Sequence, residues 1–319
     1  MSTQATRVGA SKSTIDRLLI AFLFALLAVH SAKADEVQRA SERERRALSA
    51  YNRGVVLERA ARRPEAIRAY HEALRLKPAF PQALVNLGVQ LATVGRREEA
   101  LQALDEALRL DPDVPEAHLD RGAVLGEVGR HEDAVGAFRQ AIRLRPAMAE
   151  AWSGLGLSLL ILGRDAQAVE AYEEAVRLEP ADATAHYNRA LAFSGLGRTD
   201  RAVPAFRAAL ERRPDFPEAL HGLGIGLARL GRHEDAVEAY AEAVRLRPSF
   251  AEAHYNLAVS LAKLGRRTES IRSCQAAIRL RPELIRAREL LRSLEAAIER
   301  PRGVDEVGAR LGGLRRTSG

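Results

Sequence analysis

Residues 149–182, AEAWSGLGLSLLILGRDAQAVEAYEEAVRLEPAD, contain the pattern that decides the fold. In the first half, large apolar residues recur at helical spacing, and Gly163 then ends the helix as a C-terminal glycine. In the second half, Ala168, Tyr172 and Ala175 form another apolar stripe, and Pro180 prevents this helix from continuing. The stretch therefore predicts two helices joined by a short turn.

The same pattern returns every 34 residues along the chain. Prolines keep this step at Pro78, Pro112, Pro146, Pro180, Pro214, Pro248 and Pro282, and glycines keep it at Gly95, Gly129, Gly163, Gly197, Gly231 and Gly265. A two-helix hairpin cannot bury its own apolar stripe, so neighbouring hairpins must stack into a solenoid. Aromatic residues make up only 5% of the chain, which disfavours a core of many β-strands. We therefore predict an all-α protein.

These residues resemble the signature of the tetratricopeptide-repeat family, W-x2-L-G-x2-Y…A-x3-F…P. Trp152-x2-Leu155-Gly156 and Pro180 carry the resemblance most clearly. Units of the family's length cover residues 47–80, 81–114, 115–148, 149–182, 183–216, 217–250 and 251–284. The resemblance implies a right-handed superhelical solenoid of antiparallel helix pairs. It also implies that the first helix of every unit lines a concave groove that binds peptides.

The two ends of the array depart from the repeated pattern. The first unit has Ala61 in the glycine position, and the last unit has Ser270 and Cys274 in an alanine and an aromatic position. Terminal units are expected to be atypical because one of their faces meets solvent. We expect residues 285–300 to form a C-terminal capping helix, and residues 301–319, rich in Gly and Arg, to be a disordered basic tail.

A targeting segment precedes the repeats. Basic residues, twelve apolar residues at 18–29 and the triplet AKA at 32–34 are together typical of a secretory signal peptide. A membrane-spanning helix needs about 20 apolar residues, so we expect residues 1–34 to be removed by cleavage after Ala34. Residues 35–46 would then lead into the array of an exported protein, periplasmic or secreted. The alternative is an uncleaved N-terminal membrane anchor.

The sequence lacks the patterns expected of an enzyme. One cysteine excludes a multi-cysteine metal site, and neither HExxH nor an i, i+4 histidine pair occurs. The glycines Gly154 and Gly156 lie inside a predicted helix and follow no strand, so they do not indicate a nucleotide loop. The net charge of +7 falls to +4 without residues 1–34, which hold four basic residues and one acidic residue. With no basic stripe on one face, this charge disfavours nucleic acid. We therefore expect a protein or peptide partner, and no catalytic residue, metal, cofactor or small-molecule substrate.

One column of the first helices is predicted to bind the partner. It holds a short polar residue or glycine in every unit: Asn52, Asn86, Asp120, Gly154, Asn188, Gly222 and Asn256. Asparagine is a poor residue inside a helix, and its amide both donates and accepts hydrogen bonds, which suits a peptide backbone. This asparagine column resembles the ladder in the repeat arm of O-GlcNAc transferases; the alternative is that its asparagines are only solvated. Beside it we expect apolar and aromatic contacts from Tyr51, Leu157, Tyr187, Ile225 and Tyr255.

A column of glutamates bears on specificity. Some members of the family grip acidic tails with a carboxylate clamp, and the column that supplies a lysine to it holds Glu116, Glu150, Glu218 and Glu252 here. We expect these glutamates to repel acidic tails. The sequence therefore predicts an exported scaffold that mediates protein–protein interaction by binding a peptide segment in its concave groove. The alternative is a non-catalytic subunit that recruits or regulates an envelope enzyme.

Overall fold

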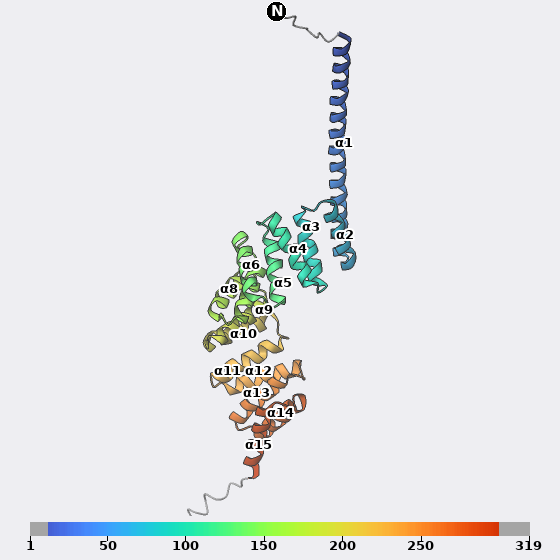
Figure 1. Ribbon diagram of the computed structural model, residues 1–319. Coiled ribbons are helices and arrows are strands. Elements are labelled where there is room, and N and C mark those ends of the chain that lie inside the picture. Colours follow the sequence, from blue (N-terminus) through green and yellow to red (C-terminus); the bar gives the residue numbers. More distant parts are fainter. Residues whose placement is uncertain (1–11, 300–319) are drawn as a thin grey trace, which may run out of the picture. The chain divides into compact units, whose positions relative to one another are not determined.

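The computed structural model describes residues 12–299, with side chains described for residue 27 and residues 29–296. Every regular element in this range is an α-helix, and the chain forms two compact units, Met1–Val124 and Leu125–Gly319 (Figure 1). The helices are α1 (Lys12–Arg59), α2 (Arg63–Leu76), α3 (Pro81–Thr93), α4 (Arg97–Leu110), α5 (Pro115–Glu127), α6 (His131–Leu144), α7 (Ala149–Ile161), α8 (Asp165–Leu178), α9 (Ala183–Gly195), α10 (Thr199–Arg212), α11 (Pro217–Arg229), α12 (His233–Leu246), α13 (Ala251–Lys263), α14 (Arg267–Leu280) and α15 (Ile285–Glu299).

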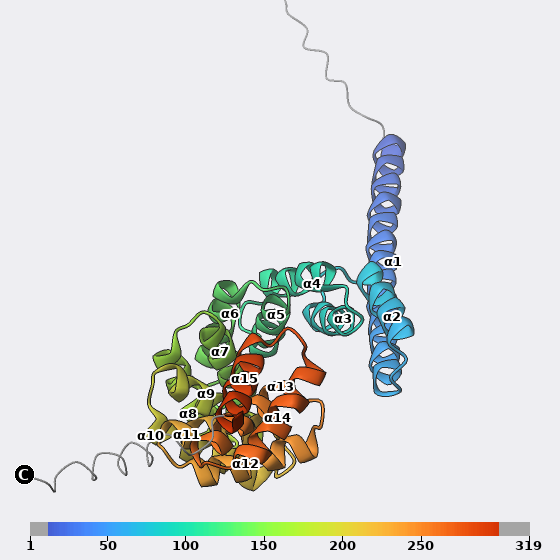
Figure 2. The same ribbon diagram turned by 90° about the horizontal axis from the view of Figure 1, so that it is seen from below.

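Consecutive helices pack as hairpins inside each compact unit. In the first unit α1 packs on α2 and α3 on α4, and Figures 1 and 2 both show α2 beside the last turns of α1. In the second unit the pairs are α7–α8, α9–α10, α11–α12 and α13–α14. The predicted unit starts are the first residues of α3, α5, α7, α9, α11 and α13, namely Pro81, Pro115, Ala149, Ala183, Pro217 and Ala251. The predicted all-α fold of stacked helix pairs is confirmed.

The repeated glycines end the first helices in the left-handed conformation. Their φ angles lie between 70° and 83° from Gly95 to Gly265. At Gly163 the next N–H, that of Arg164, donates to the Leu159 carbonyl at 2.8 Å, which satisfies a carbonyl that the helix leaves free. Ala61 occupies this position in the first unit with φ of 55°, so a side chain stands where the other units have none.

The histidines that start first helices have a structural partner. Trp152 Nε1 donates to the Pro146 carbonyl at 2.9 Å, and His118, His186 and His254 reach the repeated proline of the preceding unit in the same way, at 2.9, 3.1 and 3.1 Å. These side chains therefore tie the first helices α5, α7, α9 and α13 to the turn before them. No group of three His, Cys, Asp or Glu within residues 12–299 is placed to hold a metal ion.

The two ends of the array differ in structure. At the C-terminal end α15 packs on α13 and α14, and Leu294 joins Ala258 and Cys274 in a buried cluster. Cys274 is buried, and burial raises the pKa of its thiol to about 11. The predicted basic tail, 301–319, lies outside the described residues.

At the N-terminal end, α1 runs without a break from Lys12 to Arg59, through the predicted cleavage point and the lead-in segment. Residues 1–11 of the predicted signal peptide lie outside the described range, and its removal stays a prediction. In the described part of the chain, no helix has an apolar stretch sufficient to cross a membrane.

Candidate peptide-binding face

The first helices of the second unit share one side. Helices α7, α9, α11 and α13 contact one another in chain order. The predicted contact residues Leu157 and Ile225 occupy one column of these helices, and Tyr187 and Tyr255 occupy the column one turn earlier. We call this side the first-helix face and define it by these four residues. In the first unit, the predicted residues Tyr51, Asn52, Asn86 and Asp120 lie on α1, α3 and α5.

Two amides of the asparagine column, those of Asn86 and Asn256, bond to side chains of the protein itself. Asn86 Nδ2 donates to the hydroxyls of Tyr51 and Tyr70, at 3.3 Å each. Asn256 Nδ2 lies 2.8 Å from Nε2 of His221; with the amide as donor, His221 carries its proton on Nδ1. These N–H groups therefore join neighbouring repeats, and a contact between the asparagines and a peptide backbone stays a prediction.

The residue in the asparagine column follows from the ring that faces it. Sixteen residues before each member from Asn86 onward, a second helix contributes one large side chain to the junction between two repeats. Tyrosine precedes asparagine at three junctions, Tyr70/Asn86, Tyr172/Asn188 and Tyr240/Asn256, whereas phenylalanine precedes glycine at two, Phe138/Gly154 and Phe206/Gly222. A Cβ on Gly154 or Gly222 would lie 2.4 or 2.5 Å from the phenylalanine ring, which is too close for any side chain. The residue types in the column thus reflect packing between repeats. The sequence of the first helices alone does not show this, because the facing rings lie on the second helices.

At Asn188 and Asp120 the structure shows no hydrogen bond of standard length to the facing side chain. The Tyr172 hydroxyl is buried and has no hydrogen-bond partner within standard geometry, although Asn188 is the amide that faces it. Asp120 stands opposite Leu104, which has no hydroxyl to offer. Burial, and then the nearby charge of Glu116, raise the pKa of Asp120 to about 6.

The predicted tyrosines are part of aromatic clusters. The Tyr51 ring centroid lies 5.0 Å from that of Phe80 and 5.9 Å from that of Tyr70. Tyr187 packs in the same way, 4.8 Å from Phe216 and 6.0 Å from Phe206. Such pairs add to stability, so these tyrosines are partly committed to holding first and second helices together.

Two carboxylates of the glutamate column form ion pairs with arginines. Glu218 pairs with Arg247, and Glu252 pairs with Arg281. Partial burial raises the pKa of Glu218, but the hydrogen bonds from Arg247 and from the backbone outweigh it, so the pKa is lowered overall. An arginine 29 residues further along the chain thus pairs with each of these two carboxylates and weakens the expected repulsion of acidic tails, which stays a prediction.

Arg213 occupies the arginine position with no glutamate opposite. Its Nη2 donates to Thr184 Oγ1 at 3.1 Å, and its guanidinium lies 3.6 Å from the centroid of the Phe216 ring. No ion pair of Arg213 is present among the described residues. The charge of Arg213 at the start of α9 is therefore held in no ion pair with a described residue, although it acts on the carboxylate of Glu218.

Leu157 is the predicted contact residue that stays most open to solvent. It is 46% exposed in the middle of α7, and Ile161, one turn later, is 55% exposed. The equivalent residues Leu191, Ile225 and Val259 are half-buried on the following first helices. An apolar strip thus begins on α7 and continues along the first-helix face.

The chain resembles known proteins both in sequence and in fold. The family model described as "Tetratricopeptide repeat" matches residues 51–115, 91–125, 119–183, 166–217, 187–249 and 221–285. No curated protein matches the chain.

Three solved structures illustrate the likeness. MamA (41-end) from Desulfovibrio magneticus RS-1 is 28% identical with a TM-score of 0.51, and the match covers 53% of this chain and 96% of that one. YrrB, described as a TPR protein with an unusual peptide-binding site, is 22% identical with a TM-score of 0.54, covering 59% and 97%. The pilF protein of Pseudomonas aeruginosa is 19% identical with a TM-score of 0.59, covering 67% and 97%. The last two show likeness of fold alone.

Proposed function

Because the chain belongs to the tetratricopeptide-repeat family, whose repeats mediate protein–protein interaction, we propose that it is an exported, non-catalytic scaffold that binds a peptide segment of another protein. The binding surface is the first-helix face of the second compact unit. The observation that carries this proposal is the exposure of Leu157 and Ile161, 46% and 55%, on helices whose other apolar residues are largely buried.

The chemistry of this face favours an extended or helical segment with an apolar side chain. Transfer of a leucine-sized side chain from water onto Leu157 and Ile161 contributes about 1.5–3 kcal/mol when burial is complete. Arg213 adds a positive charge at the start of α9 that no ion pair with a described residue holds, which suits a carboxylate in the same segment. The partner segment is therefore apolar with an acidic group, and the ion pairs of Glu218 and Glu252 weaken their repulsion of it.

Export rests on the sequence of the N-terminal segment. Leu27 and Val29 are 63% and 57% exposed on α1, so the apolar run makes no packing contribution there to the array. In the proposal this run directs export and is removed after Ala34. N-terminal sequencing of the mature protein should begin at Asp35; a chain that keeps residues 1–34 and stays with membranes would support the anchor instead.

Site-specific photocrosslinking in the native cell tests the binding face. A benzoylphenylalanine at Leu157 or Ile161 should give a discrete adduct with another protein. The matched control is the same probe at Glu170, which is exposed on the second helix α8. Adducts from Glu170 and none from Leu157 or Ile161 would move the binding surface to the second helices.

A further inference from the structure

The first helix of the array has a face that no other first helix leaves open. Ser49 and Val56 of α1 are exposed, and Val56 is 64% exposed. The residues equivalent to Val56 in later units are all buried: Gln90, Val124, Ser158, Ala192, Gly226 and Ser260. The residues equivalent to Ser49, all alanines, are at most 1% exposed. We call Ser49, Asn52, Arg53 and Val56 the N-terminal face of α1.

In later units a second helix of the preceding unit covers this face. A Cβ on Gly226 of α11 would lie 2.7 Å from Val203 of α10, and Asn86 of α3 bonds to Tyr70 of α2. At the N-terminal face of α1 no described helix takes this place, and the side chain of Asn52 has no hydrogen bond to a described residue. The C-terminal end of the array has its cap in α15, but the N-terminal end has none among the described helices.

On each first helix from α3 onward, the residue of the asparagine column and the residue after it are paired with two adjacent residues of the covering second helix, sixteen positions earlier in the chain. At the first position, asparagine meets tyrosine and glycine meets phenylalanine, as described above. At the second position, arginine meets an acid: Arg121 Nε donates to Asp105 at 2.5 Å, and the charge of Glu173 acts on the half-buried Arg189. Where the second residue is leucine, the residue sixteen positions earlier, on the covering helix, is not acidic. These pairs are His71/Leu87, Arg139/Leu155, Arg207/Leu223 and Ala241/Leu257.

The open face of α1 carries the pair Asn52-Arg53. The one other first helix with Asn-Arg is α9, at Asn188-Arg189, and the helix that covers it, α8, presents Tyr172-Glu173. We infer that the N-terminal face of α1 docks a helix of another protein that carries tyrosine followed by Glu or Asp, four residues after an alanine, as in the Ala168-x3-Tyr172-Glu173 of α8.

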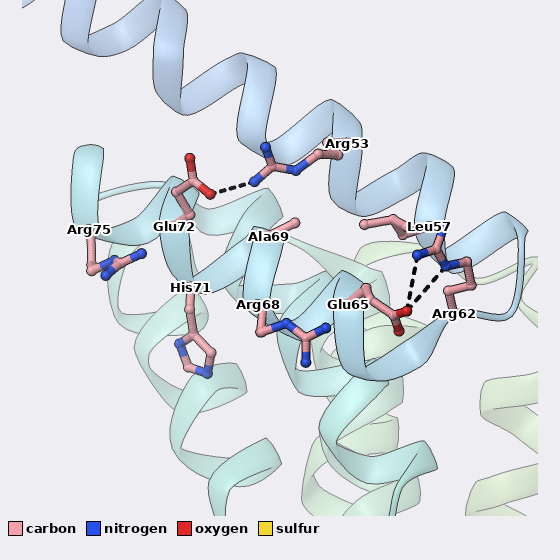
Figure 3. A pocket seen from close by; sticks show the side chains of 9 residues that line it. All are labelled: Arg53, Leu57, Arg62, Glu65, Arg68, Ala69, His71, Glu72 and Arg75. Carbon is pink, nitrogen blue, oxygen red and sulfur yellow. Dashed lines mark hydrogen bonds and ion pairs between the residues drawn. The ribbon is translucent and has the colours of Figure 1, made fainter.

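The positive charge beside the N-terminal face of α1 also favours a helix that carries an acidic residue. A cleft of about 880 Å³ between α1 and α2 adjoins it through Arg53 (Figure 3). Arg53 pairs there with Glu72, and Arg62 with Glu65, whereas Arg68 and Arg75 have no ion pair with a described residue. The lining therefore holds two more arginines than carboxylates, and an acidic helix is the complement of that charge.

Binding of stapled helical peptides to the full chain tests the inference. The probe is a peptide of residues 165–178, DAQAVEAYEEAVRL, with its versions Tyr172→Phe and Glu173→Ala. The wild-type chain should bind the tyrosine peptide about five- to tenfold more tightly than the phenylalanine peptide, since the Asn52 amide can donate to the hydroxyl as Asn86 donates to that of Tyr70. In the Asn52→Gly chain this preference should vanish or reverse, as glycine faces phenylalanine elsewhere. Glu98→Gln on α4, an exposed change, is the control and should leave binding unaltered.

Three results would overturn the inference. The first is no saturable binding of any peptide up to about 1 mM. The second is a tyrosine preference that Asn52→Gly leaves unchanged while circular dichroism shows an intact fold. The third is a concentration-dependent dimer of the full chain that Val56→Glu dissociates, which would assign the face to a second copy.

Discussion

Two junctions of the second compact unit show how similar sequences solve one packing problem differently. Between α8 and α9, Tyr172 faces Asn188, and between α10 and α11, Phe206 faces Gly222. The Phe206 ring fills the space in which an asparagine side chain would begin, since a Cβ on Gly222 would come within 2.5 Å of it. The ring with a hydroxyl, tyrosine, is thus followed sixteen positions later by asparagine, and the ring without one, phenylalanine, by glycine. The asparagine column therefore has a cause inside the fold.

The largest expected effect comes from forcing an asparagine into the phenylalanine junction. Gly222→Asn should lower the free energy of unfolding by about 3 kcal/mol, because the new Cβ must displace the Phe206 ring. Urea denaturation followed by circular dichroism measures the change. The matched control is Gly136→Ala on α6, where nothing lies within 4 Å of an added Cβ. That variant should gain about 0.5–1 kcal/mol, since alanine is the better helix former. Equal losses in both variants would contradict the packing argument.

Asp120 should respond to pH in a way that its neighbour Asn86 cannot. The pKa of Asp120 is raised from 3.8 to about 6 in the folded chain, so the folded state keeps a proton that the unfolded state has released. Stability should therefore fall as the pH rises from about 4 to 6. Asp120→Asn should remove this slope and raise stability at pH 7 by about 2 kcal/mol, which urea midpoints across this pH range would measure. An unchanged slope would place its cause at another group.

Changing the ring of this junction should destabilise the protein less than changing Gly222. Phe206→Tyr places a hydroxyl opposite Gly222, where no asparagine amide is available to bond it. A buried hydroxyl without a partner costs about 1–2 kcal/mol, so the thermal midpoint should fall. A variant as stable as the wild type would mean that the hydroxyl finds another partner, such as water, and that no asparagine is needed opposite it.

The turn of the first unit gives the smallest effect. Ala61 has φ of 55°, where every later unit of the array has a glycine. Ala61→Gly should relieve the contact of its Cβ with the backbone and stabilise the α1–α2 hairpin by about 0.5–1 kcal/mol. Amide hydrogen exchange in α2 would report the gain. Faster exchange would show that the loss of backbone entropy outweighs the strain.

The sequence predicted the repeats well because their signals are local. Helical spacing, the glycine at each turn and the proline after each pair placed the starts of α3 and α7 at the observed residues, Pro81 and Ala149. The candidate site was predicted less completely, because its interactions join residues far apart in the chain. Asn86 to Tyr70 spans 16 residues and Glu218 to Arg247 spans 29, so a column read along the first helices alone shows neither partner.

The most direct test compares the two kinds of residue on the first-helix face. With a photocrosslinker at Ile161, the adduct yield would be measured for Leu157→Asp and for Asn188→Ala with Asn256→Ala. Leu157→Asp should abolish the adduct at an unchanged midpoint of unfolding, because this side chain is 46% exposed. The double asparagine variant should keep the adduct and lose stability. Loss of the adduct in the asparagine variant, with full yield from Leu157→Asp, would contradict the account and return the asparagines to the binding site.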